Sequence, residues 1–261
     1  MAVSRSKKRR IENVIETLKH DKAAIISIIF LIVVIILSLA APFLPLEPNK
    51  TDIAHMLNAP SVHHWFGTDE VGRDYLARVI YGGRISLLVG VLAMLMSVCI
   101  GVTIGTVSGY FGGIIDAILM RIVDVMQSIP WLVLVTVISI FFKQGLSSII
   151  IVIGFFSWME ISRLVRAEIM SIKEREYILY AEFSGVSRFL IIIRHLIPAV
   201  LPTIIIAATT SIANAIMTES SLSFLGIGIQ EPMSSWGKLL QSAQSNLQNA
   251  VLKLSGDILG F

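Results

Sequence analysis

The chain has 261 residues, of which 55% are apolar and 15% are charged, and its mean hydropathy is +0.80. A soluble domain carries about 25% charged residues, so this composition excludes a soluble globular protein and indicates an integral membrane protein. The net charge of +3 is concentrated near the start of the chain, and the single cysteine, Cys99, excludes an intrachain disulfide.

Residues 1–22 form a basic tail in front of the first apolar run. A basic segment beside a membrane helix is typical of the cytoplasmic side of a bilayer. Basic patches also bind nucleic acid, but no other part of the sequence suggests a nucleic-acid module. We therefore expect contact with the lipid membrane and no nucleic-acid partner.

Five segments are apolar over about 20 residues, the length that crosses a bilayer as an α-helix. They predict an all-α, polytopic membrane helix bundle with spans over residues 23–44, 85–108, 114–142, 146–164 and 199–222. Pro130 interrupts the third span. Residues 45–84 predict an external loop, with a short amphipathic helix over residues 69–81 that leads into the second span.

The transmembrane core is thus expected over residues 85–222, including a segment, residues 166–198, that is too polar to cross the membrane. With the N-terminus in the cytoplasm, this segment is cytoplasmic as well. That orientation places 14 of the 21 Lys and Arg residues inside, in agreement with the bias of cytoplasmic loops toward basic residues. The C-terminal segment, residues 223–261, then lies outside.

One face of the second span carries small residues at a spacing of four, namely Ser97, Gly101, Gly105 and Gly109. Residues at this spacing share a helix face, and small side chains allow another helix to approach closely. We interpret the face as a helix-packing surface. The alternative is that it borders a translocation pathway.

Ionisable residues in the spans are candidates for function, because charge is costly inside a bilayer. Arg121 and Asp124 lie three residues apart, which predicts an ion pair on one helix face. Glu160 is expected near the cytoplasmic end of the fourth span. Glu219 is expected to accept hydrogen bonds, in a packing role or in contact with solute, from the serines that follow it, Ser220, Ser221 and Ser223.

The 166–198 segment predicts two short helices joined by a glycine turn. The first helix covers residues 173–184, Gly185 can adopt a left-handed conformation after it, and Ser187 can cap a second helix over residues 188–197. The apolar side chains are more numerous than a solvated linker needs: Tyr177, Ile178, Ala181, Phe183, Val186 and Phe189. Exposed apolar residues in a polar frame favour docking of a cytoplasmic partner, and a solvated linker is the alternative.

The spacing from Gly185 over nine residues to His195-Leu196-Ile197-Pro198 resembles the coupling loop of membrane subunits of ATP-binding-cassette importers. His195 matches the oligopeptide, dipeptide and nickel branch, and the chain resembles its C-type permeases from Leu18 to about Ser245. Further phrases typical of that branch are Phe66–Asp74, Arg78–Gly82, Gly109–Gly113 and Ser221–Gly226. In two respects the chain departs from the family. Leu179-Tyr180-Ala181 replaces a Glu-Ala-Ala opening, and no sixth apolar run follows residue 222.

The resemblance implies a non-catalytic permease in the plasma membrane of a prokaryote, transporting peptides or a related solute such as nickel. It implies a sister permease, two cytoplasmic ATPases that hold ATP and Mg, and an external solute-binding protein. The sequence has no Gly-x4-Gly-Lys-Ser/Thr loop for a nucleotide of its own. The resemblance implies that the following residues act in ATPase coupling: Glu176, Tyr177, Ala181, Glu182, Gly185, Val186, Arg188, His195 and Pro198.

Three other functions remain as alternatives. An ATP-independent secondary transporter or channel would carry more charge within its spans. An intramembrane enzyme would need a nucleophile and a base facing each other, but every histidine lies in a tail or a loop. His55, His63 and His64 could bind a metal such as nickel, but loop histidines are more often surface residues, so we expect no metal site.

Overall fold

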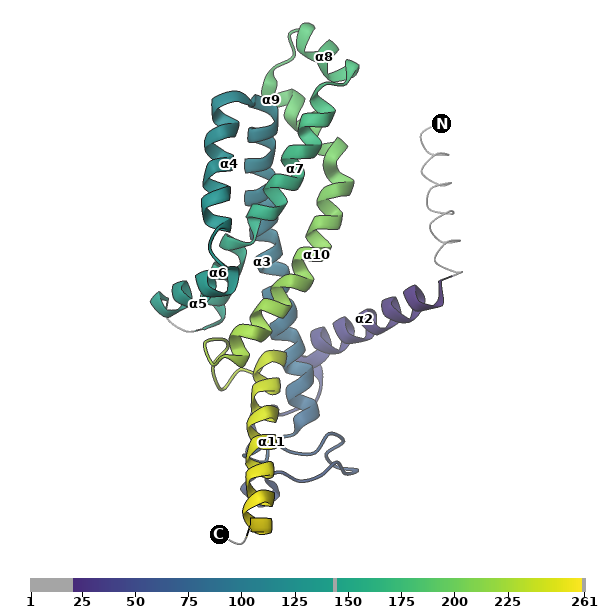
Figure 1. The fold of residues 1–261 in the computed structure, drawn as a ribbon. Coiled ribbons are helices and arrows are strands. Elements are labelled where there is room, and N and C mark those ends of the chain that lie inside the picture. The colour runs from purple at the N-terminus through teal and green to yellow at the C-terminus, as the bar shows by residue number, and fades with distance from the viewer. Residues whose placement is uncertain (1–20, 143–144, 260–261) are drawn as a thin grey trace, which may run out of the picture. The chain divides into compact units, whose positions relative to one another are not determined.

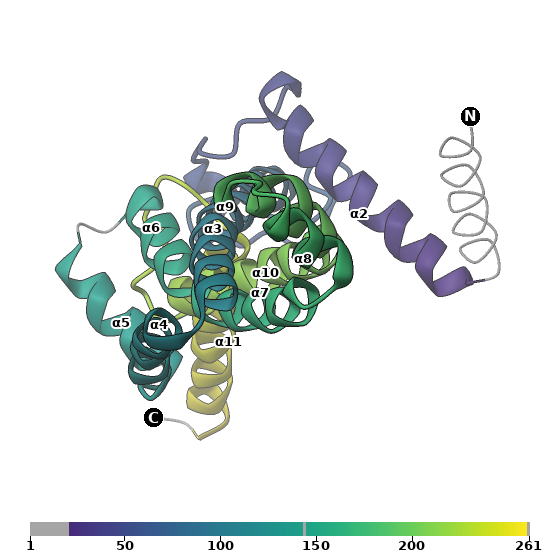
Figure 2. The same ribbon diagram turned by 90° about the horizontal axis from the view of Figure 1, so that it is seen from above.

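The computed structural model describes residues 21–142 and 145–259, and within them the fold is helical apart from one isolated β-bridge between Thr68 and Asp74 (Figures 1 and 2). The chain divides into two compact units, residues 1–84 and 85–261, which we describe separately. The expected basic tail, residues 1–22, lies outside the described residues except for Asp21 and Lys22.

The first unit begins with α2 (Lys22–Ala40), a helix of 19 residues. The Asp21 side chain caps it by accepting a hydrogen bond from the Ala24 backbone N–H at 3.1 Å. A one-turn 3-10 helix, Ala41–Phe43, follows, with proline in its first turn. Most apolar side chains of α2 are exposed within the unit, as suits a helix whose surroundings are lipid.

A buried carboxylate organises the loop after α2, which contains a short 3-10 helix, Ile53–His55. The Asp69 side chain accepts hydrogen bonds from Arg73 Nε at 2.6 Å and Arg78 Nη1 at 3.1 Å. It also accepts the backbone N–H groups of Val71 and Arg73, at 3.0 and 2.9 Å. A buried ion pair is stabilising only when its remaining lone pairs are satisfied, and here the backbone supplies the additional donors.

The amphipathic helix expected over residues 69–81 is wrong in its first half. Residues 69–74 form the Asp69 loop, because its side chain binds the N–H groups that a helix would use. Gly72 adopts φ +77°, and a Cβ there would lie 1.8 Å from the Asp52 carbonyl oxygen. The helix begins instead at Tyr75, where Asp74 Oδ1 accepts the Ala77 N–H at 2.8 Å.

Helix α3 (Tyr75–Phe111) is continuous over 37 residues and passes from the first unit into the second. The expected lead-in and second span are therefore one helix. Helices α4 (Gly113–Gln127) and α5 (Trp131–Phe141) follow and meet at an 82° bend beside Pro130. Proline has no N–H to continue the helical hydrogen bonds, which explains the break expected in the third span.

Helices α6 (Leu146–Phe156) and α7 (Trp158–Lys173) are separated by Ser157 alone. They extend the expected fourth span from Leu164 to Lys173. Helix α7 keeps an apolar stripe beyond residue 164, and Val165, Ile169 and Ile172 are all buried. Its last two turns are therefore packed as part of the bundle instead of belonging to a polar linker.

Helices α8 (Glu176–Phe183) and α9 (Arg188–Ile191) form the expected pair of short helices. The second does not end at Ile197. It continues through a π-helical turn, Ile192–Leu196, into α10 (Ile197–Phe224). Pro198 removes one backbone donor, and a widened turn is a common way to accommodate such a loss. Ser187 occupies the N-cap position of α9, but its hydroxyl makes no capping hydrogen bond.

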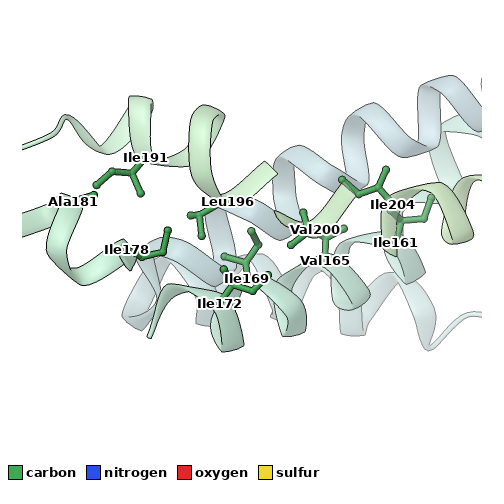
Figure 3. Close-up of a cluster of buried hydrophobic side chains, with 10 residues drawn as sticks. All are labelled: Ile161, Val165, Ile169, Ile172, Ile178, Ala181, Ile191, Leu196, Val200 and Ile204. Carbon is green, nitrogen blue, oxygen red and sulfur yellow. The ribbon is translucent and has the colours of Figure 1, made fainter. Parts of the chain in front are cut away.

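The last helix, α11 (Trp236–Leu259), packs against α10. Three buried apolar clusters lie in the described part of the second unit, and the two larger ones join most of its helices. One contains Val89, Val135, Ile153 and Leu222, and the other joins α7, α8 and α9 to α10 (Figure 3). Within the described residues, four helices are long and apolar enough to cross a membrane, or five if the bent α4–α5 pair counts as one span. Helix α11 is not among them.

Candidate functional site

The corner between α8 and α9 has the geometry of a Schellman motif. The Val186 N–H donates to the Ala181 carbonyl and the Gly185 N–H to the Glu182 carbonyl, both at 3.1 Å. Gly185 has φ +77°, the left-handed conformation that this motif needs and that glycine adopts without strain. No atom lies within 4 Å of a Cβ built on Gly185. Its role is therefore conformational.

The inner side of α8 is anchored in the apolar cluster shown in Figure 3. Ile178 and Ala181, one turn apart, point toward Ile191, Leu196 and Ile172 from three neighbouring elements. Ile178 is 1% exposed, and burying such a side chain contributes about 1.5–3 kcal/mol. The short helix is thereby fixed to the ends of α7 and α10.

The outer side of α8 and the start of α9 carry large apolar side chains without a partner among the described residues. The most exposed are Phe183 at 89%, Tyr180 at 76% and Phe189 at 71%, and Tyr177 and Leu179 are also exposed. We call these five residues the aromatic face. Three charged residues expected to act in coupling, Glu176, Glu182 and Arg188, are exposed around it.

The structure separates the residues predicted for coupling into two groups. Ala181 is buried and Val186 is half-buried against the same apolar cluster, so both lie on the anchored side of the corner and not on its exposed side. The i, i+3 spacing of Ile178 and Ala181 places both on the inner face of the helix. His195 is half-buried in the π-helical turn, and Pro198 is exposed at the start of α10.

The glycine face of α3 lies against α7. A Cβ on Gly101 would lie 2.8 Å from Ile161 Cβ, one on Gly105 would lie 2.5 Å from the Ser162 carbonyl oxygen, and one on Gly109 would lie 2.8 Å from the Arg166 carbonyl oxygen. Ser97, at the end of the face, instead hydrogen-bonds Ser211 of α10 at 3.1 Å. Small side chains here allow helix backbones to approach closely.

Two ion pairs join α4 to α7. Arg166 makes a bidentate contact with Asp116, with Nη2 donating to Oδ2 at 2.6 Å, and Ser108 Oγ donates to the same carboxylate. Arg163 pairs with Asp124. The predicted pairing of Asp124 with Arg121 is therefore wrong, because a facing helix supplies a cation closer than the one on its own helix.

A cavity of about 620 Å³ lies within the second unit. It is lined by the ends of α4 and α5 at their bend, by α6 and α7 around Ser157, and by α10. In a membrane, irregular backbone occurs where it lines a cavity or is covered by protein. The polar side chains that line it are those of Gln127, Ser157, Glu160, Thr210, Ser211, Asn214 and Thr218.

Residues 101–257, more than half of the chain, match the family described as the binding-protein-dependent transport system inner membrane component. Residues 11–60 match the N-terminal transmembrane domain of oligopeptide transport permease C. The chain belongs to this permease family.

Three relatives are similar over most of the permease. It is 42% identical to the oligopeptide transport system permease protein OppC of Haemophilus influenzae, covering 88% of this chain and 75% of the relative. It is 41% identical to the dipeptide transport system permease protein DppC of Bacillus subtilis, covering 84% and 69%. It is 39% identical to OppC of Escherichia coli, covering 88% and 77%. These relatives place the permease in the C-type oligopeptide and dipeptide branch.

The fold of the permease is similar to that of a chain of the inward-facing MetNI methionine ABC transporter. The TM-score is 0.54 at 18% sequence identity, over 70% of this chain and 95% of that chain. With its several apolar helices, the permease is a multi-pass membrane protein of the importer type.

Glu219 shows what helix spacing can and cannot predict in the permease. It is 0% exposed, and Ser223 Oγ donates to its Oε1 at 2.7 Å, as the i, i+4 spacing predicts. The second donor is Ser86 of α3, whose Oγ lies 3.0 Å from Oε2. Ser221 instead donates to the Met217 carbonyl. The hydrogen bond between Ser86 and Glu219 joins residues 133 positions apart, so no local sequence pattern could predict it.

The loop histidines lie beside carboxylates. His55 Nδ1 lies 2.8 Å from Asp52 and His64 Nδ1 lies 2.8 Å from Asp74. The hydrogen bond from His55 lowers the pKa of the Asp52 carboxyl below its ordinary value. Across residues 21–142 and 145–259, no three His, Cys, Asp or Glu side chains are grouped as a metal site.

Proposed function

We propose that the permease forms half of the translocation pathway of an ATP-driven importer and couples it to a cytoplasmic ATPase through the aromatic face. The observation that carries the proposal is the construction of α8. Its inner side is anchored among buried residues of α7 and α10, and its outer side presents Tyr180 and Phe183. An exposed apolar patch on a rigid support is typical of a protein contact site.

The substrates follow from the relatives, which are named as oligopeptide and dipeptide permeases. Peptides are therefore the proposed cargo, and a related small solute such as nickel is the alternative. The partners are a sister permease, two ATPase subunits and an external solute-binding protein. ATP and Mg belong to the ATPase subunits, and the permease itself is non-catalytic.

The coupling is mechanical. When the two ATPases close on ATP, each displaces the α8 that it holds. The apolar cluster passes this movement to α7 and α10, since packed helices move as rigid bodies. Both helices line the cavity of 620 Å³, so their displacement opens it first to one side of the membrane and then to the other.

This function requires α8 and the N-terminus to lie in the cytoplasm and the loop before α3 to lie outside. The distribution of basic residues supports that orientation. The membrane is then the plasma membrane of a prokaryote, with the solute-binding protein on its outer surface.

The test is a transporter reconstituted in liposomes with all its subunits. Phe183→Ala should remove most peptide uptake while the subunits remain assembled, because the contact that transmits ATPase movement is lost. Phe43→Ala is the matched control, since Phe43 is 88% exposed but lies in the first unit. Gly185→Val should have the same effect by straining the turn, whereas Gly185→Asn should not, because asparagine tolerates a left-handed conformation.

The two readouts are ATP hydrolysis and uptake of trialanine, measured together. Uncoupling appears as fewer peptides taken up per ATP hydrolysed. Wild-type uptake and ATPase binding in both Phe183→Ala and Gly185→Val would contradict the role of α8.

A further inference from the structure

Glu160 gives the cavity a negative charge. It is the one ionisable residue among the described residues that line the 620 Å³ space. The other polar groups there are neutral amides and hydroxyls, including Gln127 at the end of α4 and Asn214 on α10. A solute inside the cavity is therefore exposed to one charged group, the Glu160 carboxylate, and to neutral polar groups that can form hydrogen bonds but no ion pairs.

No cation in the described part of the chain neutralises this carboxylate. Arg163, one turn further along α7, is paired with Asp124 of α4. Arg166 is held by Asp116. The nearest basic residues of α7 are thus engaged by α4, and the Glu160 side chain is exposed.

Glu160 does not serve as a helix cap either. It is the third residue of α7, where a glutamate can accept the N–H of the N-cap residue in a capping box. Here the N-cap is Ser157, whose N–H donates to the Ile153 carbonyl at 3.0 Å. The carboxylate is thus free of the local structural role that its position would suggest.

The start of α7 opposes the charge of Glu160 only in part. A helix N-terminus carries the equivalent of about half a positive charge, and the carboxylate carries a full negative one. The start of α5 also lines the cavity, but the ends of α4 and α6 line it too and carry the opposite partial charge. The sum of these charges and the carboxylate is negative. A cavity of 620 Å³ also falls within the range of about 300–1,000 Å³ that holds small organic ligands.

We propose that Glu160 receives a protonated amino group of the solute as it passes through the cavity, so that the permease favours cationic over anionic solutes. The inference rests on the proposed function, since it assumes that this cavity is part of the pathway. The amides of Gln127 and Asn214 can hydrogen-bond the neutral part of the same solute.

The experiment compares uptake of Ala-Lys-Ala and Ala-Glu-Ala by the complete transporter in liposomes. Both wild type and variants use the same solute-binding protein, so its own selectivity cancels when their uptake ratios are compared. Glu160→Gln should lower the ratio of lysine to glutamate peptide about fivefold, which corresponds to about 1 kcal/mol. Glu160→Asp, which keeps the charge, should retain most of the preference.

Two further variants separate charge in the cavity from charge on α7. Glu168→Gln removes a carboxylate from the same helix outside the cavity and should leave the ratio unchanged. Asn214→Asp adds a carboxylate on the facing helix and should raise the ratio. An unchanged ratio in both Glu160→Gln and Asn214→Asp would overturn the inference.

Trialanine uptake distinguishes this failure from failure of the proposed function. If wild type imports trialanine with ATP but the ratio does not respond to Glu160, the importer assignment stands and the inference is wrong. If wild type imports none of the three peptides, the proposal that peptides are the cargo is wrong, and the inference about Glu160 is wrong as well. Glu160→Gln should assemble with the other subunits as the wild type does, because its folded structure loses no contact.

Discussion

Single glycines determine how closely α3 and α7 approach each other. At Gly105 the facing group is a backbone oxygen, the Ser162 carbonyl, which cannot rotate out of the way as a side chain could. Without a hydrophobic effect between helices in lipid, close packing is a main source of their association. The absence of a side chain at this position is therefore a stabilising feature.

Gly105→Leu should force the two helices apart and lower the thermal stability of the detergent-solubilised permease. Overpacking costs about 1–3 kcal/mol, and in a chain of this size each kcal/mol lowers Tm by about 2–4 °C. The matched control is Thr103→Leu, two residues away on the exposed side of α3. Equal Tm values for the two variants would show that the glycine contact does not matter.

At the residue scale, the sequence predicts partners on the same helix and misses partners on other helices. The bond between Ser223 and Glu219 follows from their spacing. The pairing of Asp124 with Arg163 does not, since 39 residues separate them and only the packing of α4 on α7 brings them together. The sequence predicts Glu160 near the cytoplasmic end of the fourth span, but the structure places it in the first turn of α7, in the middle of the span Leu146–Lys173. The cavity beside it is formed by α4, α5, α6, α7 and α10 jointly.

Helices α4 and α7 form one mechanical element through their two ion pairs. The pairs differ in exposure. The Arg166 and Asp116 side chains are 30% and 16% exposed, whereas those of Arg163 and Asp124 are 47% and 50% exposed. Asp116 also accepts a hydrogen bond from Ser108 of α3, so three helices meet at this carboxylate.

Double-mutant cycles should therefore give different coupling energies for the two pairs. The cycle of Asp116→Ala with Arg166→Ala should give about 1–3 kcal/mol, as for partly buried groups in one network. The cycle of Asp124→Ala with Arg163→Ala should give at most about 1 kcal/mol, because water screens an exposed pair. Free energies of unfolding in detergent provide the measurement, and equal coupling energies would contradict the argument from burial.

At the element scale, apolar runs predict where helices lie better than where they end. The bend near Pro130 follows from proline chemistry. The start of α3 at Tyr75 depends on the Asp69 side chain taking N–H groups from the preceding turn, a competition that hydropathy does not register. The join of α9 to α10 depends similarly on a widened turn before Pro198. Local backbone hydrogen bonding decides such boundaries.

The orientation of the whole permease depends on whether the bent α4–α5 pair crosses the membrane. If it crosses, five spans precede α11, and α8 lies on the same side as the N-terminus. If it re-enters on its own side, four spans remain. Helix α8 is then on the same side as the loop before α3, out of reach of a cytoplasmic ATPase.

Cysteine labelling decides between these two arrangements. In a Cys99→Ser background, Val62→Cys marks the loop before α3 and Glu174→Cys marks the start of the α8 corner. Both positions are exposed, and Glu174 lies outside the aromatic face. If the bent pair crosses, a membrane-impermeant maleimide added to intact cells labels only the Val62→Cys variant, and the Glu174→Cys variant reacts after the membrane is opened.

The permease should be expressed without its ATPase subunits, so that protection of residue 174 reports the membrane and not a bound partner. Labelling of both variants in intact cells would mean that the bent pair re-enters. The aromatic face would then lie outside the cell, and the assignment of α8 to ATPase coupling would be wrong. Membership of the permease family would not be affected, because it rests on sequence similarity. The basic residues between 163 and 194 favour the crossing arrangement. Re-entry would place them outside the cell, whereas Lys and Arg are enriched in cytoplasmic loops.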